Sequence, residues 1–186
     1  MSTSEQWEEH AEDWIRRARS EGHDHYFWRV SRPALLALPP APGRLTIDVA
    51  CGEGRLARVL RERGHHVVAV ENSMALARAA REIARVLVPG GRLCASIVHP
   101  VRSAAEAPHY FTEHPYAETR TRGGLTMTFH DIHRPLEAYS RALGGAGFLI
   151  EALREPVPTP EHVSDWPAAA SSRETPRFLV LRARKA

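Results

Sequence analysis

An acidic residue and two closely spaced glycines stand between two short apolar runs. The segment Asp48–Gly54 reads DVACGEG, and the apolar runs on either side of it are rich in Val and Ile. Glycine allows a sharp turn and a close approach of the backbone to a ligand. Glu71 follows the second apolar run, where a carboxylate can accept hydrogen bonds from two ribose hydroxyls. These residues predict a site for a nucleotide-like ligand at the ends of two strands.

The glycine spacing alone does not choose the ligand. Gly52, Gly54 and Ala57 satisfy the G-x-G-x-x-G/A fingerprint of dinucleotide-binding folds. Such folds usually keep apolar residues before the first glycine, because the pyrophosphate lies there. The carboxylate of Asp48 would repel a phosphate and attract a cationic group, such as a sulfonium or an ammonium. Asp48 therefore favours a cationic ligand over a nicotinamide or flavin dinucleotide. Binding of such a dinucleotide by the same glycines remains a third hypothesis.

The surrounding pattern predicts the elements that position these residues. A strand precedes Asp48, a helix from about Arg55 buries Leu56, Val59 and Leu60 and ends at Gly64, and a second strand runs to Val70. Helical spacing then continues to Leu87. Further strands are expected at 92–98, 148–153 and 178–181, with a helix beginning at Pro135 and a proline-rich loop over 156–176. Strands that alternate with helices indicate an α/β fold.

Two regions lie outside this alternation. Residues 1–40 are expected to form an N-terminal helical cap, with Trp7 and Trp14 on one stripe as core or as a lid. His23 and His25 lack further ligands at suitable spacing, so no metal site is expected. In the main domain, residues 41–186, a hairpin insertion is expected at about 108–131, with strands at 110–112 and 125–129 around Gly123-Gly124.

Four segments together resemble one known family. The residues 48–54 (DVACGEG) look like the first motif of class I S-adenosylmethionine-dependent methyltransferases, and 67–73 (VVAVENS) look like their second, ribose-binding motif. Residues 85–93 (RVLVPGGRL) are similar to the helix end, turn and fifth strand of that family, and Gly147-Phe148 with the strand from Phe178 resembles its C-terminal pair. The resemblance is closest to small-molecule enzymes of methyltransferase type 11. It implies a Rossmann-like three-layer sandwich with a mostly parallel sheet and an antiparallel last strand.

The sequence departs from the family pattern at two places. Ala50 stands where the family usually has glycine, and a side chain fits there only if φ stays negative. Ala80 runs directly into Arg81, whereas the family places its third and fourth strands before this point. The internal deletion amounts to about 30 residues or more, and in the family it includes the loop that recognises adenine. One continuous helix can cross the join, which leaves the shortened strand order 2-1-5-7-6 in family names.

The resemblance implies S-adenosyl-L-methionine as the cofactor. The cofactor-binding residues that it implies are Asp48, Ala50, Cys51, Gly52, Gly54, Glu71, Asn72 and Met74. His99 follows the strand at 92–98, so it is a candidate general base beside a methyl acceptor. Tyr110, Phe111, His130, His133 and Trp166 could shape an acceptor pocket or serve as core and loop residues.

Composition limits the alternatives. The net charge of the 186 residues is +3, and arginine is scattered rather than clustered, so no nucleic-acid partner is expected. No apolar run has membrane-spanning length, and two cysteines in or beside apolar strands suit the cytoplasm. The sequence predicts a methyltransferase that acts on an unidentified small molecule. The alternative is a degenerate methyltransferase-like domain that binds cofactor weakly or not at all and acts as a binding module.

Overall fold

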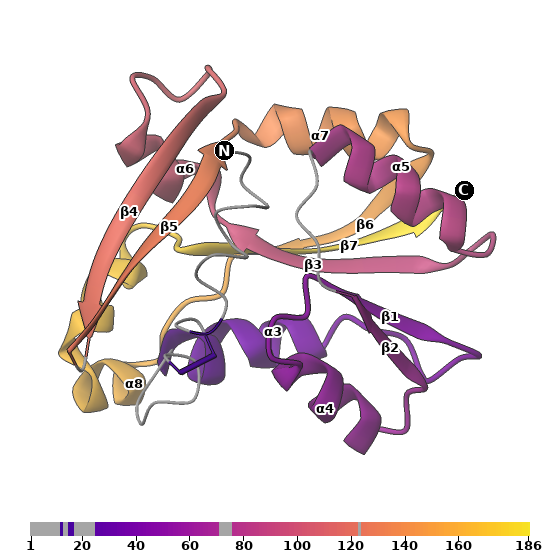
Figure 1. The fold of residues 1–186 in the computed structure, drawn as a ribbon, viewed down its shortest axis with the longest axis horizontal. Helices are drawn as coiled ribbons and strands as arrows, with labels where there is room; N and C mark the ends of the chain where they lie inside the picture. Colours follow the sequence, from indigo (N-terminus) through magenta and orange to yellow (C-terminus); the bar gives the residue numbers. More distant parts are fainter. Residues whose placement is uncertain (1–11, 13–14, 17–24, 71–75, 123) are drawn as a thin grey trace. The chain divides into compact units, whose positions relative to one another are not determined.

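A computed structural model describes residues 12, 15–16, 25–70, 76–122 and 124–186. The chain folds as two compact units that interleave along the sequence (Figure 1). The first unit includes residues 40–74 and 118–130, and the second includes residues 24–39, 75–117 and 131–186. Trp7, Trp14, His23, Glu71, Asn72, Ser73 and Met74 lie outside the described residues, so the predictions made for them stay predictions.

The first unit contains a strand–helix–strand motif. β1 (Thr46–Val49) pairs in parallel with β2 (Val67–Val70), and α4 (Arg55–Glu62) connects them and packs on β2. The helix buries Ala57 and Leu60 and ends before Gly64, whose φ of 85° is the left-handed conformation that suits glycine. The start of β1 is fixed by a bond between Thr46 Oγ1 and His65 Nδ1 at 2.9 Å. The predicted strand–loop–helix–strand order is confirmed.

The second unit is built on a three-stranded sheet. Its strands are β3 (Arg92–Val98), β7 (Phe178–Lys185) and β6 (Phe148–Arg154), in that order. β7 is antiparallel to both neighbours, so β3 and β6 run in the same direction. A register shift between Ile150 and Ala152 bends the β6 ladder. The sequence prediction found all three strands, although β6 and β7 extend further than expected.

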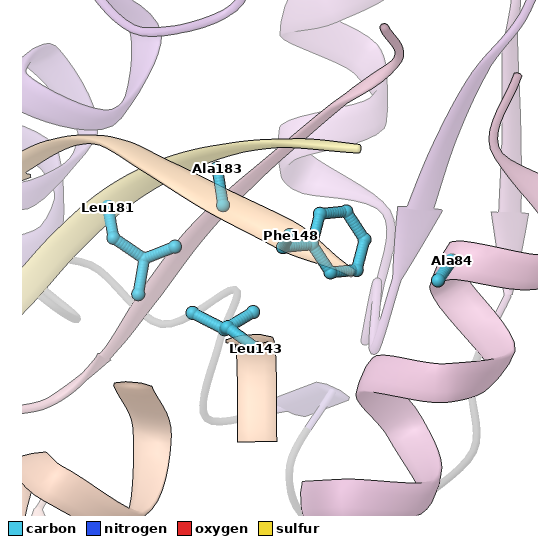
Figure 2. Close-up of a cluster of buried hydrophobic side chains, with 5 residues drawn as sticks. All are labelled: Ala84, Leu143, Phe148, Leu181 and Ala183. Atoms are coloured by element: carbon cyan, nitrogen blue, oxygen red, sulfur yellow. The ribbon is translucent and has the colours of Figure 1, made fainter. Parts of the chain in front are cut away.

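Two helices cover one face of this sheet. α5 (Leu76–Val86) and α7 (Leu136–Gly145) lie on the same side of it (Figure 1). Figure 2 shows the buried cluster between them and the strands. Its buried members are Ala84, Leu143, Phe148, Leu181 and Ala183. Four of these five residues come from segments that the helical or strand periodicity identified, whereas Ala183 lies in the part of β7 beyond the predicted end of the strand at residue 181.

Ala80 and Arg81, where the sequence was compared with the family pattern and a deletion was inferred, both lie within α5, so the predicted continuous helix across this point is confirmed from Leu76 onward. The Pro89-Gly90-Gly91 turn then leads into β3 and forms backbone hydrogen bonds with the end of β7. Gly90 N–H donates to the Lys185 carbonyl at 3.1 Å, and Lys185 N–H donates to the Gly91 carbonyl at 2.8 Å. The turn thus sets the register of β3 against β7.

Within the described residues, the strands form three separate sets of hydrogen-bonded neighbours. They are β1-β2, β3-β7-β6 and a third pair, β4 (His114–Arg122) with β5 (Leu125–His133). The order β3-β7-β6 corresponds to the 5-7-6 part of the predicted order. The remaining step requires a ladder between β1 and β3, and this ladder is not among the pairs of the described residues. β1 and β2 pair in parallel, whereas β3 and β6 each pair with β7 in the antiparallel direction.

Several local predictions were wrong in detail. The first hairpin strand begins at His114 instead of Tyr110, and Phe111 is 85% exposed in the preceding turn. The Thr and Arg alternation that forms β4 was missed because its residues are polar on both faces. Pro135 is the N-cap of α7 rather than its first residue.

The proline-rich segment before β7 is helical, not a loop. It contains α8 (Pro160–Asp165) and the 3₁₀ helix η3 (Pro167–Arg173). Thr159 caps α8 by accepting a hydrogen bond from His162 N–H at 3.2 Å, and Pro160 occupies the first turn. The prolines therefore begin helices here instead of excluding them.

A short helical region precedes β1. It consists of a π-helical segment, η1 (Phe27–Ser31), that continues into α3 (Arg32–Leu36). Both elements lie within residues 1–40, which were expected to be helical. After β3, a four-residue helix, α6 (Pro100–Ser103), is followed by the 3₁₀ turn η2 (Ala104–Glu106).

Candidate functional site

The loop between β1 and α4 is the first part of the candidate site. Asp48 lies near the end of β1 and is only 7% exposed, whereas Ala50 and Gly52 are exposed. A turn closes the loop, because Gly54 N–H donates to the Cys51 carbonyl at 2.9 Å. Gly54 is the N-cap of α4 and has no side chain, so the first N–H groups of the helix adjoin the loop. The loop thus combines an inward carboxylate with exposed backbone.

The backbone of this loop uses left-handed conformations repeatedly. Ala50, Gly52 and Gly54 have φ values of 60°, 54° and 79°. The expectation of a negative φ at Ala50 is therefore wrong. An L-residue in this conformation brings Cβ close to the following carbonyl and costs about 1–2 kcal/mol. Backbone strain of this kind is concentrated in ligand-binding loops, so the φ of Ala50 is consistent with a binding role for this loop.

Glu53 stabilises the loop from within. Its carboxylate, only 7% exposed, accepts hydrogen bonds from Arg58 Nη2 at 2.8 and 2.9 Å, and Arg58 Nη1 donates to the Glu53 carbonyl at 2.9 Å. This two-point contact ties the loop to α4 one turn further on. No role was predicted for Glu53 from the sequence, although an acidic residue five positions before an arginine at the start of a helix is a recognisable signal for such a contact.

Five of the predicted cofactor residues lie together in this loop. They are Asp48, Ala50, Cys51, Gly52 and Gly54. β2 ends at Val70, opposite Val49 of β1, and the predicted ribose ligand Glu71 is the next residue in the sequence. Glu71, Asn72 and Met74 themselves lie outside the described residues.

His99, the predicted general base, belongs to the second unit and is 4% exposed. Both of its ring nitrogens make hydrogen bonds. Nδ1 accepts from Val101 N–H at 3.1 Å and thereby caps α6, and Nε2 lies 2.9 Å from Oε1 of Glu155. A buried ring with both nitrogens in use cannot contact an acceptor directly without losing one of these bonds.

A second buried histidine, His133, contacts α6 through Ser103. His133 has no exposed surface, and its Nδ1 and Nε2 lie 2.8 Å from Ser103 Oγ and from the Tyr110 carbonyl oxygen. The ring of Tyr110 also contacts the His133 ring edge to face at 5.8 Å. This arrangement favours the core role for His133 over an acceptor pocket.

Histidine and aromatic rings also gather at α8. The Trp166 ring stacks with His25 at 5.7 Å and meets His162 edge to face at 5.7 Å. Burial of His162 lowers its pKa, and the nearby positive charge of Arg29 acts in the same direction. His162 was not singled out in the sequence, since its burial depends on a helix that was expected to be a loop.

No group of three or more potential metal ligands occurs within the described ranges. In the same ranges, none of the helices has the length and apolar character needed to cross a membrane.

Comparisons with known proteins identify the fold. No protein-family model matches the chain, and no curated protein matches its sequence. Among solved structures, an S-adenosylmethionine-dependent methyltransferase from Mesorhizobium loti is 24% identical, with a TM-score of 0.66 over 82% of this chain and 96% of that one.

Two further structures are similar at lower identity. The Burkholderia thailandensis 1,6-didemethyltoxoflavin-N1-methyltransferase, solved with S-adenosylhomocysteine, is 16% identical with a TM-score of 0.54 over 100% of this chain and 92% of that one. The glycopeptide N-methyltransferase MtfA, solved with S-adenosylmethionine, is 15% identical with a TM-score of 0.51 over 91% and 90%. The chain therefore has the mixed α/β, Rossmann-like fold of S-adenosylmethionine-dependent methyltransferases.

Proposed function

We propose that the chain is an S-adenosylmethionine-dependent methyltransferase that acts on a small molecule. The observation that carries the proposal is the buried carboxylate of Asp48 at the end of β1, beside a loop with three left-handed residues and the start of α4. A carboxylate suits a ligand with ammonium and sulfonium charges and opposes a pyrophosphate. The loop residues thus fit this cofactor better than a dinucleotide.

The residues proposed to hold the cofactor are those predicted from the sequence. Asp48 and the backbone of Ala50, Cys51, Gly52 and Gly54 would bind the amino-acid end. Glu71, Asn72 and Met74 of the second motif would complete the cofactor site. When bound, S-adenosylmethionine supplies an activated methyl group. The chain's own contribution is to orient the acceptor and exclude water, since in-line methyl displacement can be accelerated by positioning alone.

The role of His99 in this proposal is indirect. Its ring is buried and caps α6, so direct proton abstraction from an acceptor is the weaker reading. No base is required before the transfer where the acceptor atom is a strong nucleophile in its neutral form, because any proton that it carries can leave to solvent afterwards. The proposed acceptor is therefore a nucleophile that the protein mainly positions.

The finer architecture is part of the same proposal. We expect β1 to pair with β3 in the strand order 2-1-5-7-6, with residues 1–40 as a helical cap over the main domain. The support is the β3-β7-β6 order, which matches its 5-7-6 part. Two cysteines without a disulfide among the described residues agree with a cytoplasmic protein.

Titration calorimetry with S-adenosylmethionine and S-adenosylhomocysteine tests the proposal. Micromolar binding that is lost in Asp48→Asn supports it. Absence of binding at millimolar ligand by a folded protein favours the degenerate domain, and binding of a nicotinamide cofactor instead favours the third reading.

A further inference from the structure

An exposed carboxylate lies at one edge of the β3-β7-β6 sheet and contacts a buried imidazole. β3 ends at Val98 and β6 at Arg154, and both are antiparallel to β7, so their carboxyl ends meet at the same edge. The residues that follow these ends are His99 and Glu155. Their side chains meet at 2.9 Å, with the His99 side chain 6% exposed and the Glu155 side chain 59% exposed.

The hydrogen bonds fix the position of the His99 proton. Nδ1 accepts the N–H of Val101, so this nitrogen has no proton in the observed geometry. The ring proton is therefore on Nε2, and Nε2 donates it to Oε1 of Glu155. His99 thus holds the carboxylate through one oxygen, while most of the Glu155 side chain remains exposed.

The backbone that carries Glu155 is held as well. Tyr26 Oη donates to the Pro156 carbonyl at 3.0 Å, and Arg173 Nη1 donates to the Pro158 carbonyl at 2.6 Å. Tyr26 and Pro158 are both almost completely buried, and each proline restricts φ. The segment is therefore preorganised, although the carboxylate that it presents faces solvent.

Several other carboxylates in this unit form ion pairs with arginine. Glu151, for example, contacts the Nε atoms of Arg92, Arg182 and Arg184 at 2.9–3.3 Å. Within the described part of the chain, Glu155 forms an ion pair with no arginine or lysine, and its printed contact is the N–H of a singly protonated imidazole. Its negative charge is oriented but not neutralised by these contacts.

We propose that Glu155 binds a positively charged or N–H-bearing nitrogen group of a small organic ligand at this edge of the β3-β7-β6 sheet, and that His99 is its positioning residue. The ligand class is then amines and related nitrogen bases, rather than carboxylates or phosphates. This inference goes beyond the proposed function, and ligands of open α/β sheets bind outside the carboxyl ends of the strands, where Glu155 lies. An ammonium group also occurs in the cofactor, so the test must separate the two sources.

The test follows the His99 ring by NMR in protein labelled with ¹⁵N-histidine. Benzylammonium, benzyl alcohol and benzoate serve as probes because they share one size and differ in the group presented. We expect the free protein to show the Nε2–H tautomer at His99, and benzylammonium alone to shift its signals with saturation in the millimolar range. Equal or stronger shifts with benzoate, or shifts caused by S-adenosylmethionine but not by benzylammonium, would overturn the proposal.

Two variants separate binding from structural support. Glu155→Gln keeps an oxygen for the His99 bond and removes the charge, so benzylammonium affinity should fall roughly 10-fold to 100-fold, the effect of one charge-assisted hydrogen bond. Glu137→Gln, which alters an exposed carboxylate on α7, is the matched control and should bind as the wild type does. Unchanged affinity in folded Glu155→Gln contradicts the assignment.

His99→Asn addresses the positioning role. Asparagine is a good N-cap and can keep α6 folded, but its shorter side chain does not reach Glu155. Weaker benzylammonium binding at a nearly unchanged melting temperature supports positioning, whereas a lower melting temperature with unchanged binding would show a purely structural contact. Calorimetry with S-adenosylmethionine on the same samples tests the proposed function separately, since that binding can fail while the Glu155 site is intact.

Discussion

Oγ of Ser103 lies 2.8 Å from Nδ1 of His133, and both side chains are buried although they are 30 residues apart. The bond joins α6, which follows β3, to the end of β5. The other ring nitrogen of His133 binds the Tyr110 carbonyl, so one histidine fixes three segments.

Loss of this histidine should destabilise the second unit. His133→Leu removes the ring partner of the Tyr110 carbonyl and one of the two partners of the buried Ser103 hydroxyl, which also lies 3.2 Å from the Pro100 carbonyl oxygen, so we expect the free energy of unfolding to fall by about 1–3 kcal/mol. Ser103→Ala should cost about 1 kcal/mol. Because the two residues share one bond, the double variant should lose less than the sum, as urea unfolding can measure. Strict additivity contradicts the coupling.

The exposed threonine pair of the hairpin gives a control for that cycle. Thr121 Oγ1 and Thr126 Oγ1 are also 2.8 Å apart, but both side chains are exposed. Thr121→Ala should change the free energy of unfolding by less than about 0.5 kcal/mol, since water replaces the lost partner.

The left-handed conformation of Ala50 predicts a stabilising substitution. Ala50→Gly removes a Cβ that costs about 1–2 kcal/mol at this φ and adds chain entropy to the unfolded state, for a net gain of about 0.5–1 kcal/mol. Gly43→Ala is a control, because no atom lies within 4 Å of the new Cβ and its φ is not in the left-handed region. Thermal unfolding that shows Ala50→Gly to be less stable than the wild type contradicts the conformation.

Alanine substitutions at the two adjacent glycines of the turn before β3 should differ in their cost to stability. A Cβ on Gly91 would lie 2.7 Å from the Val88 carbonyl oxygen, and one on Gly90 would meet nothing within 4 Å but would sit at a φ of 72°. Gly91→Ala should therefore cost about 1–3 kcal/mol, through a backbone clash. Gly90→Ala should cost about 1 kcal/mol, through strain alone. The reverse ranking in denaturant unfolding would contradict this turn.

The two cysteines should differ in reactivity. Burial raises the pKa of the Cys94 thiol from 9.0 to about 11, against the opposing effect of the nearby charges of Arg182 and Arg92. Its thiolate fraction is therefore small near pH 8, and alkylation in a Cys51→Ser variant should accelerate with pH until about 11. Cys51, in the loop after β1, should react faster in Cys94→Ser. Equal rates at pH 8 would contradict the burial of Cys94.

Periodicity in the sequence was sufficient to predict most elements of the strand–helix–strand motif and of the three-stranded sheet with its two helices. β1, α4, β2, α5, β3, α7 and β6 all follow from apolar spacing bounded by glycine or proline. The same reasoning failed at 156–176, because the capping bond of Thr159 outweighs the proline content. It also failed at β4, where cross-strand pairs such as Thr119 with Thr128 take the place of an apolar face.

The candidate site was predictable only in part. The glycine spacing and Asp48 identified the loop, since turns and strand ends have local sequence signals. The positive φ of Ala50 reversed an expectation, because it depends on how the whole loop closes. The contact of His99 with Glu155 spans 56 residues and depends on β3 and β6 flanking β7, which no local pattern specifies.

Calorimetry of S-adenosylhomocysteine binding to the wild type and to Asp48→Asn tests the central claim most directly. Asparagine keeps the size of the buried side chain and removes its charge, so a folded variant is expected. We predict micromolar binding to the wild type and at least about a 10-fold loss in Asp48→Asn, the effect of one charge-assisted contact. Equal affinity of the two proteins, or no binding to the folded wild type at millimolar ligand, would contradict the account.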